Sequence, residues 1–362
     1  MAWRDLYSVF RIISQGTKQS GLALHHYNFN GLFSLTTNVP YFEGLLHAFR
    51  NDQDANIKFQ FILDDDLEVK TKGKPRINLM LYHDADSNAV DFYYPWLRPI
   101  SARLIFGHPK SSYEFRFNKN YMRFSNFVAE GWEIIDVFRS LLMIGLIQSD
   151  NYMIHGAALR IGEEGVLIPS FGNTGKTTTS WLLARGGAEF LTDEFAIVNS
   201  DGECLGFPCS SLLSPSLVTE IGLKLSKTEM MSLRLNEFKS RILTTRFAPG
   251  GMKVYPDQHF KLCEKTQINR MIFIQNGIDH VQEVNEERAI AMLKAIQRYE
   301  LNWSSNPYII AQSFFQPNLD VAQLSSKEDD LIRNLVAKVK QCLLVSSSSA
   351  AHFTHIAEIM ND

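Results

Sequence analysis

The stretch that decides the fold runs from Ile154 to Val198 and reads IHGAALRIGEEGVLIPSFGNTGKTTTSWLLARGGAEFLTDEFAIV. Two apolar runs, Ala157–Ile161 and Val166–Pro169, flank the turn Gly162-Glu163-Glu164-Gly165, which predicts a β-hairpin. A glycine-bearing loop follows, and then the run Thr178–Arg185, which predicts a helix. A strand, a glycine-bearing loop and a helix in this order are what a phosphate-binding loop requires.

The loop itself, from Ser170 to Thr177, matches the pattern G-x-x-x-x-G-K-S/T at every fixed position except the first, where Ser170 replaces glycine. Glycines without a Cβ let consecutive backbone N–H groups turn inward around phosphate oxygens. Lys176 can then neutralise phosphate charge, and the Thr177 hydroxyl can join a Mg²⁺ shell. We therefore expect ATP and Mg²⁺ as ligands. The residues expected to contact the nucleotide are Gly172, Asn173, Thr174, Gly175, Lys176, Thr177 and Thr178.

Two carboxylates, Asp193 and Glu194, follow the run Glu189–Thr192, which predicts the next strand, and Asp193 stands sixteen residues after Thr177. In open α/β sheets, ligands bind beyond the carboxyl ends of strands. A carboxylate there can hold Mg²⁺ or accept a proton from an attacking hydroxyl. The alternative is a pair of solvated carboxylates in a turn.

His155 precedes the hairpin, and a lone histidine is more often a structural residue than a reactive one. Further along, Lys239, Arg241, Arg246 and Lys253 surround the segment Ala248-Pro249-Gly250-Gly251. Arg241 and Arg246 are candidates for contacting a transferring phosphoryl group, because a guanidinium group binds phosphate bidentately. A solvated loop is the alternative for this segment.

Taken together, His155-Gly156, the hairpin, the loop ending in Gly175-Lys176-Thr177 and the run Phe190–Glu194 resemble the HPr kinase/phosphorylase family. That family has a histidine-glycine pair, a loop of the form G-x-S-G-x-G-K-S, and an aspartate pair after the next strand. It shares its nucleotide-binding core with ATP-dependent phosphoenolpyruvate carboxykinases. The resemblance implies an α/β fold with this P-loop core and a mixed sheet.

The resemblance also implies roles for individual residues. Lys176 would contact phosphates, and Thr177 would ligate Mg²⁺. Asp193 would be the base for the acceptor hydroxyl, with His155 assisting its carboxylate, and Glu194 would help to hold the metal.

The chain departs from the family pattern at several positions. Ser170 stands where the family has glycine, Gly172-Asn173 where it has serine-glycine, and Glu194 where it has a second aspartate. Residues 1–128 do not look like the usual first domain of the family. A divergent member that phosphorylates a peptide, another protein or a small hydroxyl metabolite therefore fits better than a kinase of HPr itself.

The N-terminal part, residues 1–128, carries short runs rich in β-branched and aromatic residues and predicts a strand-rich domain that is a candidate for acceptor recognition. The predicted strands are Leu22–Tyr27, Ile57–Leu63, Ile77–Tyr82, Ala89–Tyr94, Ala102–Phe106 and Tyr113–Phe117. The kinase domain would cover residues 129–362. Its predicted elements outside the central stretch are a helix over Glu130–Gln148, a strand at Ile272–Ile274, and helices over Arg288–Tyr299 and Asp329–Lys340.

Composition excludes several classes of protein. With 36 Lys and Arg against 39 Asp and Glu, the formal charge is 36 − 39 = −3, so the chain is no polycation built for nucleic acid. Its four cysteines are too few for a disulfide scaffold. The longest apolar stretch, Ile134–Ile147, is interrupted by Asp136 and Arg139, so we expect neither a membrane span nor membrane binding. A cytoplasmic location is expected, and homo-oligomerisation is left open.

The sequence thus predicts an ATP-dependent kinase that acts on a hydroxyl, with serine as the leading acceptor. One alternative is a nucleotide-binding regulator without turnover. A carboxykinase would need a further lysine–histidine metal site and an oxaloacetate pocket, neither of which can be assigned. A GTPase switch is disfavoured because the guanine-reading motif Asn-Lys-x-Asp is absent from the sequence.

Overall fold

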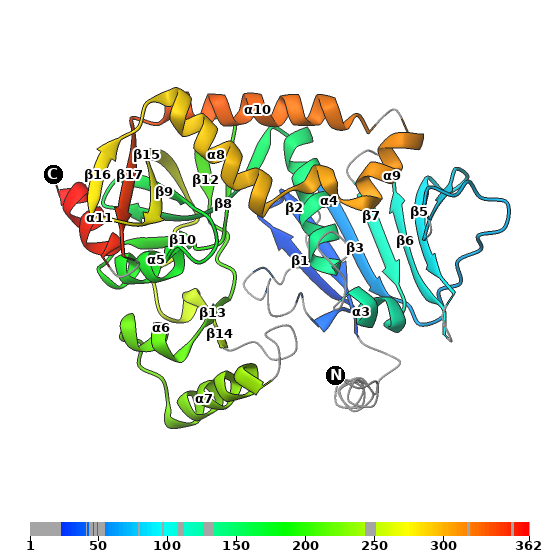
Figure 1. The fold of residues 1–362 in the computed structure, drawn as a ribbon, viewed down its shortest axis with the longest axis horizontal. Coiled ribbons are helices and arrows are strands. Elements are labelled where there is room, and N and C mark those ends of the chain that lie inside the picture. Colours follow the sequence, from blue (N-terminus) through cyan, green and yellow to red (C-terminus); the bar gives the residue numbers. More distant parts are fainter. Residues whose placement is uncertain are drawn as a thin grey trace.

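The computed structural model describes residues 23–40, 55–78, 80–95, 98–107, 112–125, 133–242, 251–316, 319–348 and 351–361, together with Phe42, Leu46 and Phe49. Two large β-sheets lie beside one another, and a long helix, α10 (Val321–Lys338), runs along both (Figure 1). The described chain is therefore a mixed α/β structure.

The first sheet has the spatial order β1-β2-β3-β7-β6-β5-β4. β3 is parallel to both of its neighbours, β2 and β7, and the other neighbours are antiparallel. The strands are β1 (His25–Phe29), β2 (Phe33–Thr37), β3 (Ile57–Leu63), β4 (Leu81–Asp84), β5 (Ala89–Tyr94), β6 (Ile100–Phe106) and β7 (Ser112–Phe117). The short helix α3 (Lys119–Ser125) follows β7.

Alternation of apolar and polar residues explains these strands. In β3, Ile57, Phe59 and Phe61 are buried while Lys58 and Gln60 between them are exposed, as the twofold period of a strand requires. The predicted bounds of β3 and β5 are confirmed. β1 and β4 begin a few residues after their predicted starts, and β2 was not predicted.

The second sheet has the order β10-β8-β11-β12-β15-β17-β16, and β9 pairs with both β8 and β15. β15 is parallel to β9 and β17, and the other pairs are antiparallel, so the predicted mixed sheet is confirmed. Its strands are β8 (Asn151–Ile161), β9 (Glu164–Pro169), β10 (Glu189–Thr192), β11 (Phe195–Asn199), β12 (Glu203–Leu205), β15 (Lys265–Asn276), β16 (His280–Glu283) and β17 (Gln341–Ser347). A separate pair is formed by β13 (Ser211–Leu213) and β14 (Met252–Val254).

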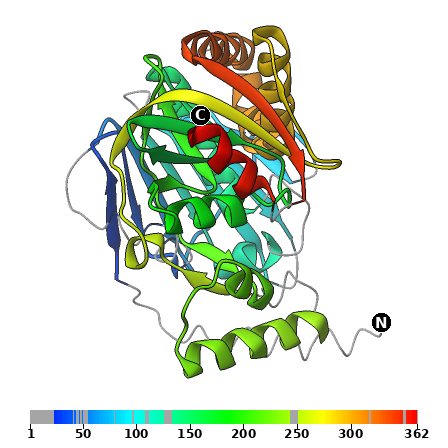
Figure 2. The ribbon, with the colours of Figure 1, turned by 90° about the vertical axis from the view of Figure 1, so that its left-hand side faces the viewer.

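Helices cover both faces of the second sheet. Ala157 and Leu159 of β8 pack with α5 (Lys176–Arg185) and α11 (His352–Asn361), which lie together in Figure 2. Ile154 and Ala158, on the opposite face, belong to the core that includes α10 and α8 (Glu286–Glu300). The remaining helices are α4 (Ile134–Gln148), α6 (Pro215–Glu220), α7 (Lys227–Ile242), η2 (Pro256–Gln258), η3 (Trp303–Ser305) and α9 (Pro307–Phe315).

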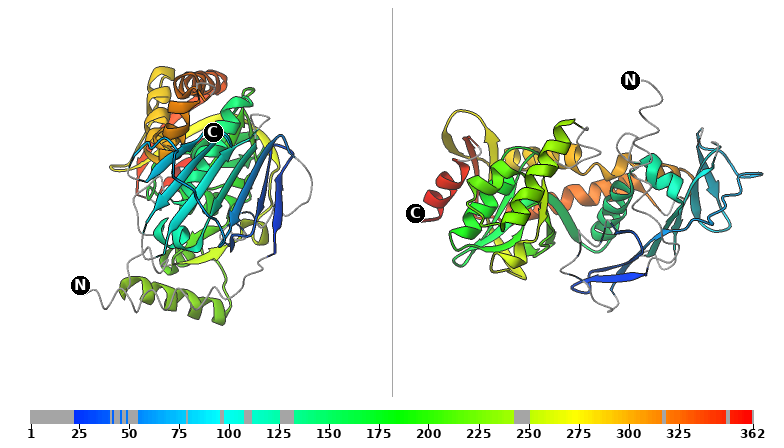
Figure 3. Two further views of the ribbon diagram at one scale, coloured as in Figure 1. Left: turned by 90° about the vertical axis from the view of Figure 1, so that its right-hand side faces the viewer. Right: turned by 90° about the horizontal axis from the view of Figure 1, so that it is seen from below.

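One apolar core joins the two sheets. α4 lies between them (Figure 3), and its Phe138 ring centroid is 5.1 Å from that of Phe42 and 5.4 Å from that of Phe59. From the other end of the chain, α9 lies against β4 and β5, and the Tyr308 hydroxyl donates a hydrogen bond to Tyr121 Oη at 3.1 Å. The two predicted domains, residues 1–128 and 129–362, thus share buried side chains.

The four cysteines are all buried and free. Within the described ranges, no helix is both long and apolar enough to cross a membrane.

Candidate active site

The pairing register of β8 brings three predicted elements together. On one side, Gly156 pairs with Pro169, the residue before the predicted phosphate loop. On the other side, His155 pairs with Phe195, and the Gly156 N–H donates to the Glu194 carbonyl at 3.0 Å. A Cβ at position 156 would lie 3.0 Å from the Ile168 carbonyl oxygen, so glycine permits this close approach.

The loop between β9 and α5 contains two residues in the left-handed region. Asn173 has a φ of +63° and Gly175, which caps α5, has a φ of +98°; glycine is suited to this left-handed region and asparagine tolerates it. Ser170 lies outside the left-handed region, so its Cβ is compatible with the first turn of the loop. Ser170 is buried, and its hydroxyl has no hydrogen-bond partner among the described residues.

Lys176 and His155 form a buried polar pair. Lys176 Nζ lies 2.8 Å from His155 Nε2, and His155 Nδ1 lies 2.8 Å from the Ser170 carbonyl oxygen. The second contact requires a proton on Nδ1, so Nε2 accepts from the ammonium group. Burial, reinforced by the Lys176 charge, lowers the pKa of His155 to about 3, which keeps the ring neutral. Burial also lowers the pKa of Lys176, while Glu194, Asp193 and Glu300 act in the opposite direction.

Asp193 is the buried carboxylate of the site, only 4% exposed. Its Oδ2 accepts a hydrogen bond from Ser211 Oγ at 2.6 Å. Burial raises the pKa of Asp193 to about 6, and Glu194 adds to this, while the Ser211 hydrogen bond opposes it. The Asp193 carboxyl group is therefore mostly ionised at neutral pH, and its pKa is close to that of an effective general base.

His155 does not contact Asp193 here, although the family resemblance implies that it assists this carboxylate. Both ring nitrogens of His155 are engaged elsewhere, with Lys176 and Ser170, and the hydrogen bond to Asp193 comes from Ser211. The backbone N–H of His155 donates to Gln297 Oε1 at 3.0 Å, which ties β8 to α8.

Glu194 and Asp193 interact with different side chains. Its Oε1 lies 3.3 Å from Arg139 of α4, and the Arg139 guanidinium carbon lies 4.9 Å from the centroid of the Phe195 ring. The cation of Arg139 therefore offsets the charge of Glu194 at the edge of the site.

The C-terminal end of α8 contacts the loop between β9 and α5 directly. The Gly172 N–H donates to Glu300 Oε1 at 2.6 Å, and the rings of Phe171 and Tyr299 meet edge to face at 5.6 Å. The Glu300 carboxylate thus accepts a hydrogen bond from the Gly172 N–H. In a phosphate-binding loop, this N–H is available to a phosphate oxygen.

The oxygen atoms of Thr177, Asp193 and Glu194 are of the kind that Mg²⁺ takes as ligands. Mg²⁺ takes oxygen ligands and is commonly held by one or two carboxylates together with substrate phosphates and water. Thr177, in the first turn of α5, forms no side-chain hydrogen bond among the described residues, and Asp193 and Glu194 supply the carboxylates. Within the described chain, no group of three His, Cys, Asp or Glu side chains has a metal-binding arrangement, so phosphate oxygens would be needed to complete the set.

The two predicted arginines are not tested. The backbone of Arg241 lies in the last turn of helix α7, but its side chain lies outside what the structure describes, as does all of Arg246. Sequence reasoning did not select Arg139, Ser211, Gln297 or Glu300. None of the four belongs to a motif, and Glu300 is 128 positions away from Gly172, so only the fold brings them to the site.

No family model matches the chain, and no curated protein matches its sequence.

Proposed function

We propose that this protein is an ATP-dependent kinase that transfers the γ-phosphate of ATP to a hydroxyl group. A serine of a peptide or protein is the leading acceptor, and a small hydroxyl metabolite is the second. The resemblance to the HPr kinase/phosphorylase family, with the core shared with phosphoenolpyruvate carboxykinases, belongs to this proposal. The observation that carries it is the convergence of Lys176, at the start of the helix after the loop, with the buried carboxylate of Asp193.

Phosphate binding is the first role of the site. The loop N–H groups and the N-terminal end of α5 favour a polyphosphate, because both present partial positive charge. Lys176 exchanges its neutral partner, His155 Nε2, for a phosphate oxygen, and the neutral imidazole leaves no repelling charge behind. When bound, Mg²⁺ neutralises charge on the phosphate oxygens and would be held by Thr177, Asp193 and Glu194.

Proton transfer is the second role. Ser211 holds Oδ2 of Asp193, which leaves Oδ1 to accept the proton of the acceptor hydroxyl. As the hydroxyl oxygen bonds to the γ-phosphorus, the bond from that phosphorus to the β–γ bridging oxygen breaks, and ADP leaves. Positioning and charge neutralisation supply most of the rate in such reactions.

The test is ADP release with Mg²⁺ in the presence of free serine and of hydroxyl-bearing peptides. The wild type should respond to one acceptor, and Lys176→Ala should abolish that response. Asp193→Asn should slow transfer about a hundredfold or more while changing ATP affinity little, since a positioned base contributes roughly 10²–10⁴-fold. Near-full transfer by Asp193→Asn would show that Asp193 is not the base.

A nucleotide-binding regulator without turnover is the second candidate. The observation that favours it is the Glu300 carboxylate on the Gly172 N–H, which competes with a phosphate group. ATP binding that no acceptor converts into ADP release would put this function first.

A further inference from the structure

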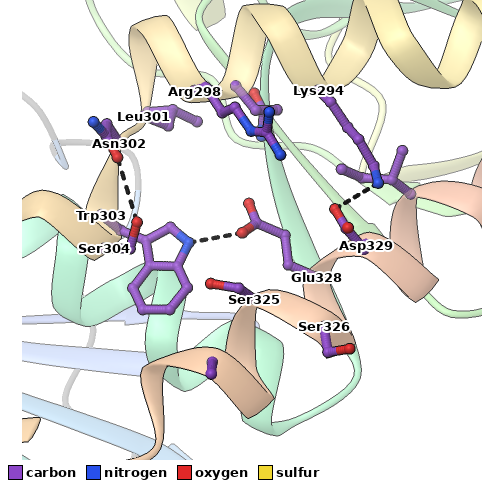
Figure 4. Close-up of a pocket in the computed structure, with 13 residues that line it drawn as sticks. Lys294, Arg298, Leu301, Asn302, Trp303, Ser304, Ser325, Ser326, Glu328 and Asp329 are labelled. Atoms are coloured by element: carbon purple, nitrogen blue, oxygen red, sulfur yellow. Dashed lines mark hydrogen bonds and ion pairs between the residues drawn. The ribbon is translucent and has the colours of Figure 1, made fainter.

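A cavity of about 410 Å³ lies between α8, η3 and α10 (Figure 4), and its lining includes Gln297, which also contacts β8. This volume falls in the range of small-molecule sites, roughly 300–1,000 Å³. The lining is mainly polar. The side chains that line it include Lys294, Arg298, Trp303, Ser325, Glu328 and Asp329.

Two of the four charged groups in this cavity neutralise one another. Lys294 Nζ lies 2.7 Å from Asp329 Oδ1, and this ion pair lies at one side of the cavity (Figure 4). Arg298, one helical turn after Lys294, is exposed and has neither an ion pair nor a hydrogen bond among the described residues. The cavity therefore presents an unpaired guanidinium group.

Glu328 is the counterpart of Arg298. Its Oε2 accepts a hydrogen bond from Trp303 Nε1 at 2.9 Å, and its carboxylate points into the cavity toward the side of α8 that carries Arg298 (Figure 4). Burial raises the pKa of Glu328, and the hydrogen bond from Trp303 and the charge of Arg298, which forms no direct ion pair with it, oppose this only in part. A ligand that places a cation at Glu328 Oε1 would provide the positive charge that this carboxylate lacks.

We propose that this cavity binds a free amino acid, with its carboxylate on Arg298 and its ammonium group on Glu328. Guanidinium and carboxylate match as a bidentate pair, and the half-buried carboxylate of Glu328 is the partner that the cavity offers to an ammonium group. The charges of this ligand balance those of the site, whereas a simple anion would leave Glu328 uncompensated. The apolar body of Trp303 and the Ser325 hydroxyl remain for the side chain of the ligand.

The test is isothermal titration calorimetry of the full chain with a panel of free amino acids, without nucleotide. For each amino acid that binds, the amide that lacks the carboxylate and the acid that lacks the amino group are titrated as well. Removing one charged partner of a buried hydrogen-bonded pair should weaken binding about ten- to a hundredfold. The proposal therefore requires both single-charge analogues, and both Arg298→Ala and Glu328→Gln, to bind at least tenfold more weakly.

Arg288→Ala is the matched control, because Arg288 is an exposed arginine on the same helix that does not line the cavity. It should bind as the wild type does. Glu328→Gln keeps the size of the side chain, and its circular dichroism spectrum reports whether it folds. Absence of heat with every amino acid, or equal binding by Arg298→Ala, would overturn the proposal. This readout is independent of phosphoryl transfer, so its failure would leave the proposed kinase activity untouched.

Discussion

Replacing Glu300 by alanine is expected to tighten ATP binding. The Glu300 carboxylate accepts the Gly172 N–H at 2.6 Å, and a phosphate oxygen must displace it to use the same donor. A hydrogen bond to a charged group is worth about 1.5–3 kcal/mol when buried, and the exposure of Gly172 reduces this to about 1–2 kcal/mol. Because displacement of Glu300 subtracts this amount from the binding free energy, its removal should lower the Kd for ATP about 5- to 30-fold.

The assay is calorimetric titration with ATP and Mg²⁺ at low and at high ionic strength. Glu300→Gln keeps a carbonyl acceptor but loses the charge, so its Kd should lie between those of the wild type and Glu300→Ala. Salt should reduce the difference between variants, since screening weakens the repulsion between the carboxylate and the phosphates. Glu287→Ala, at an exposed position in the first turn of the same helix, is the control and should leave the Kd unchanged.

Weaker binding by Glu300→Ala would refute this reasoning, because it would mean that Glu300 helps to hold the nucleotide. An unchanged Kd would refute it too, since the carboxylate would then not compete with a phosphate oxygen.

Three further outcomes are expected. The pKa of Asp193 is raised from 3.8 to about 6, so the folded state holds a proton that the unfolded state releases, and the stability of the protein should fall as the pH rises through this window. Asp193→Asn should therefore raise the free energy of unfolding at neutral pH by up to about 3 kcal/mol, measured by urea denaturation, although it slows transfer. In the wild type, transfer should decline as the pH falls below about 6, where Asp193 takes up its proton. Phe138→Ala should lower the free energy of unfolding by about 3–5 kcal/mol, because its buried ring packs against Phe59 and Phe61 of the first sheet; a loss below about 1 kcal/mol would contradict this packing.

Local patterns were sufficient for the centre of the fold. The hairpin β8–β9, the loop and α5 follow one another within a short stretch whose turn residues and apolar runs indicate each element, although β8 begins at Asn151, before the predicted start at Ala157. By contrast, β2 (Phe33–Thr37) was missed because its five residues, FSLTT, offer only two large apolar side chains to a periodicity argument. α10 begins earlier than predicted, since Asp320 caps it by accepting from the Gln323 N–H, ahead of the strongly apolar part of the helix.

Some contacts of the candidate site could also be predicted from the sequence, and others could not. The sequence predicted the proximity of Lys176 to Asp193 through strand order, which is a general property of α/β sheets. The partners of these residues could not be predicted, because Ser211 reaches Asp193 from a separate two-stranded sheet and Glu300 reaches Gly172 from the end of a distant helix. His155 is an example of what could not be predicted. Its position next to the loop was expected, but its hydrogen bond with Lys176 was not.

The covering of the first sheet by α9 has a consequence during protein synthesis. Tyr121 and Tyr308 are 187 residues apart in the chain, and their contact closes the face of the sheet next to β4 and β5. At a translation rate of about 5–20 residues per second, β1–β7 would emerge from the ribosome roughly 10–40 s before α9. During that interval the aromatic side chains of the sheet lack part of their native cover. A nascent chain that is stalled before residue 307 should therefore depend on chaperones that bind exposed apolar surface, and this dependence should end once α9 has been released.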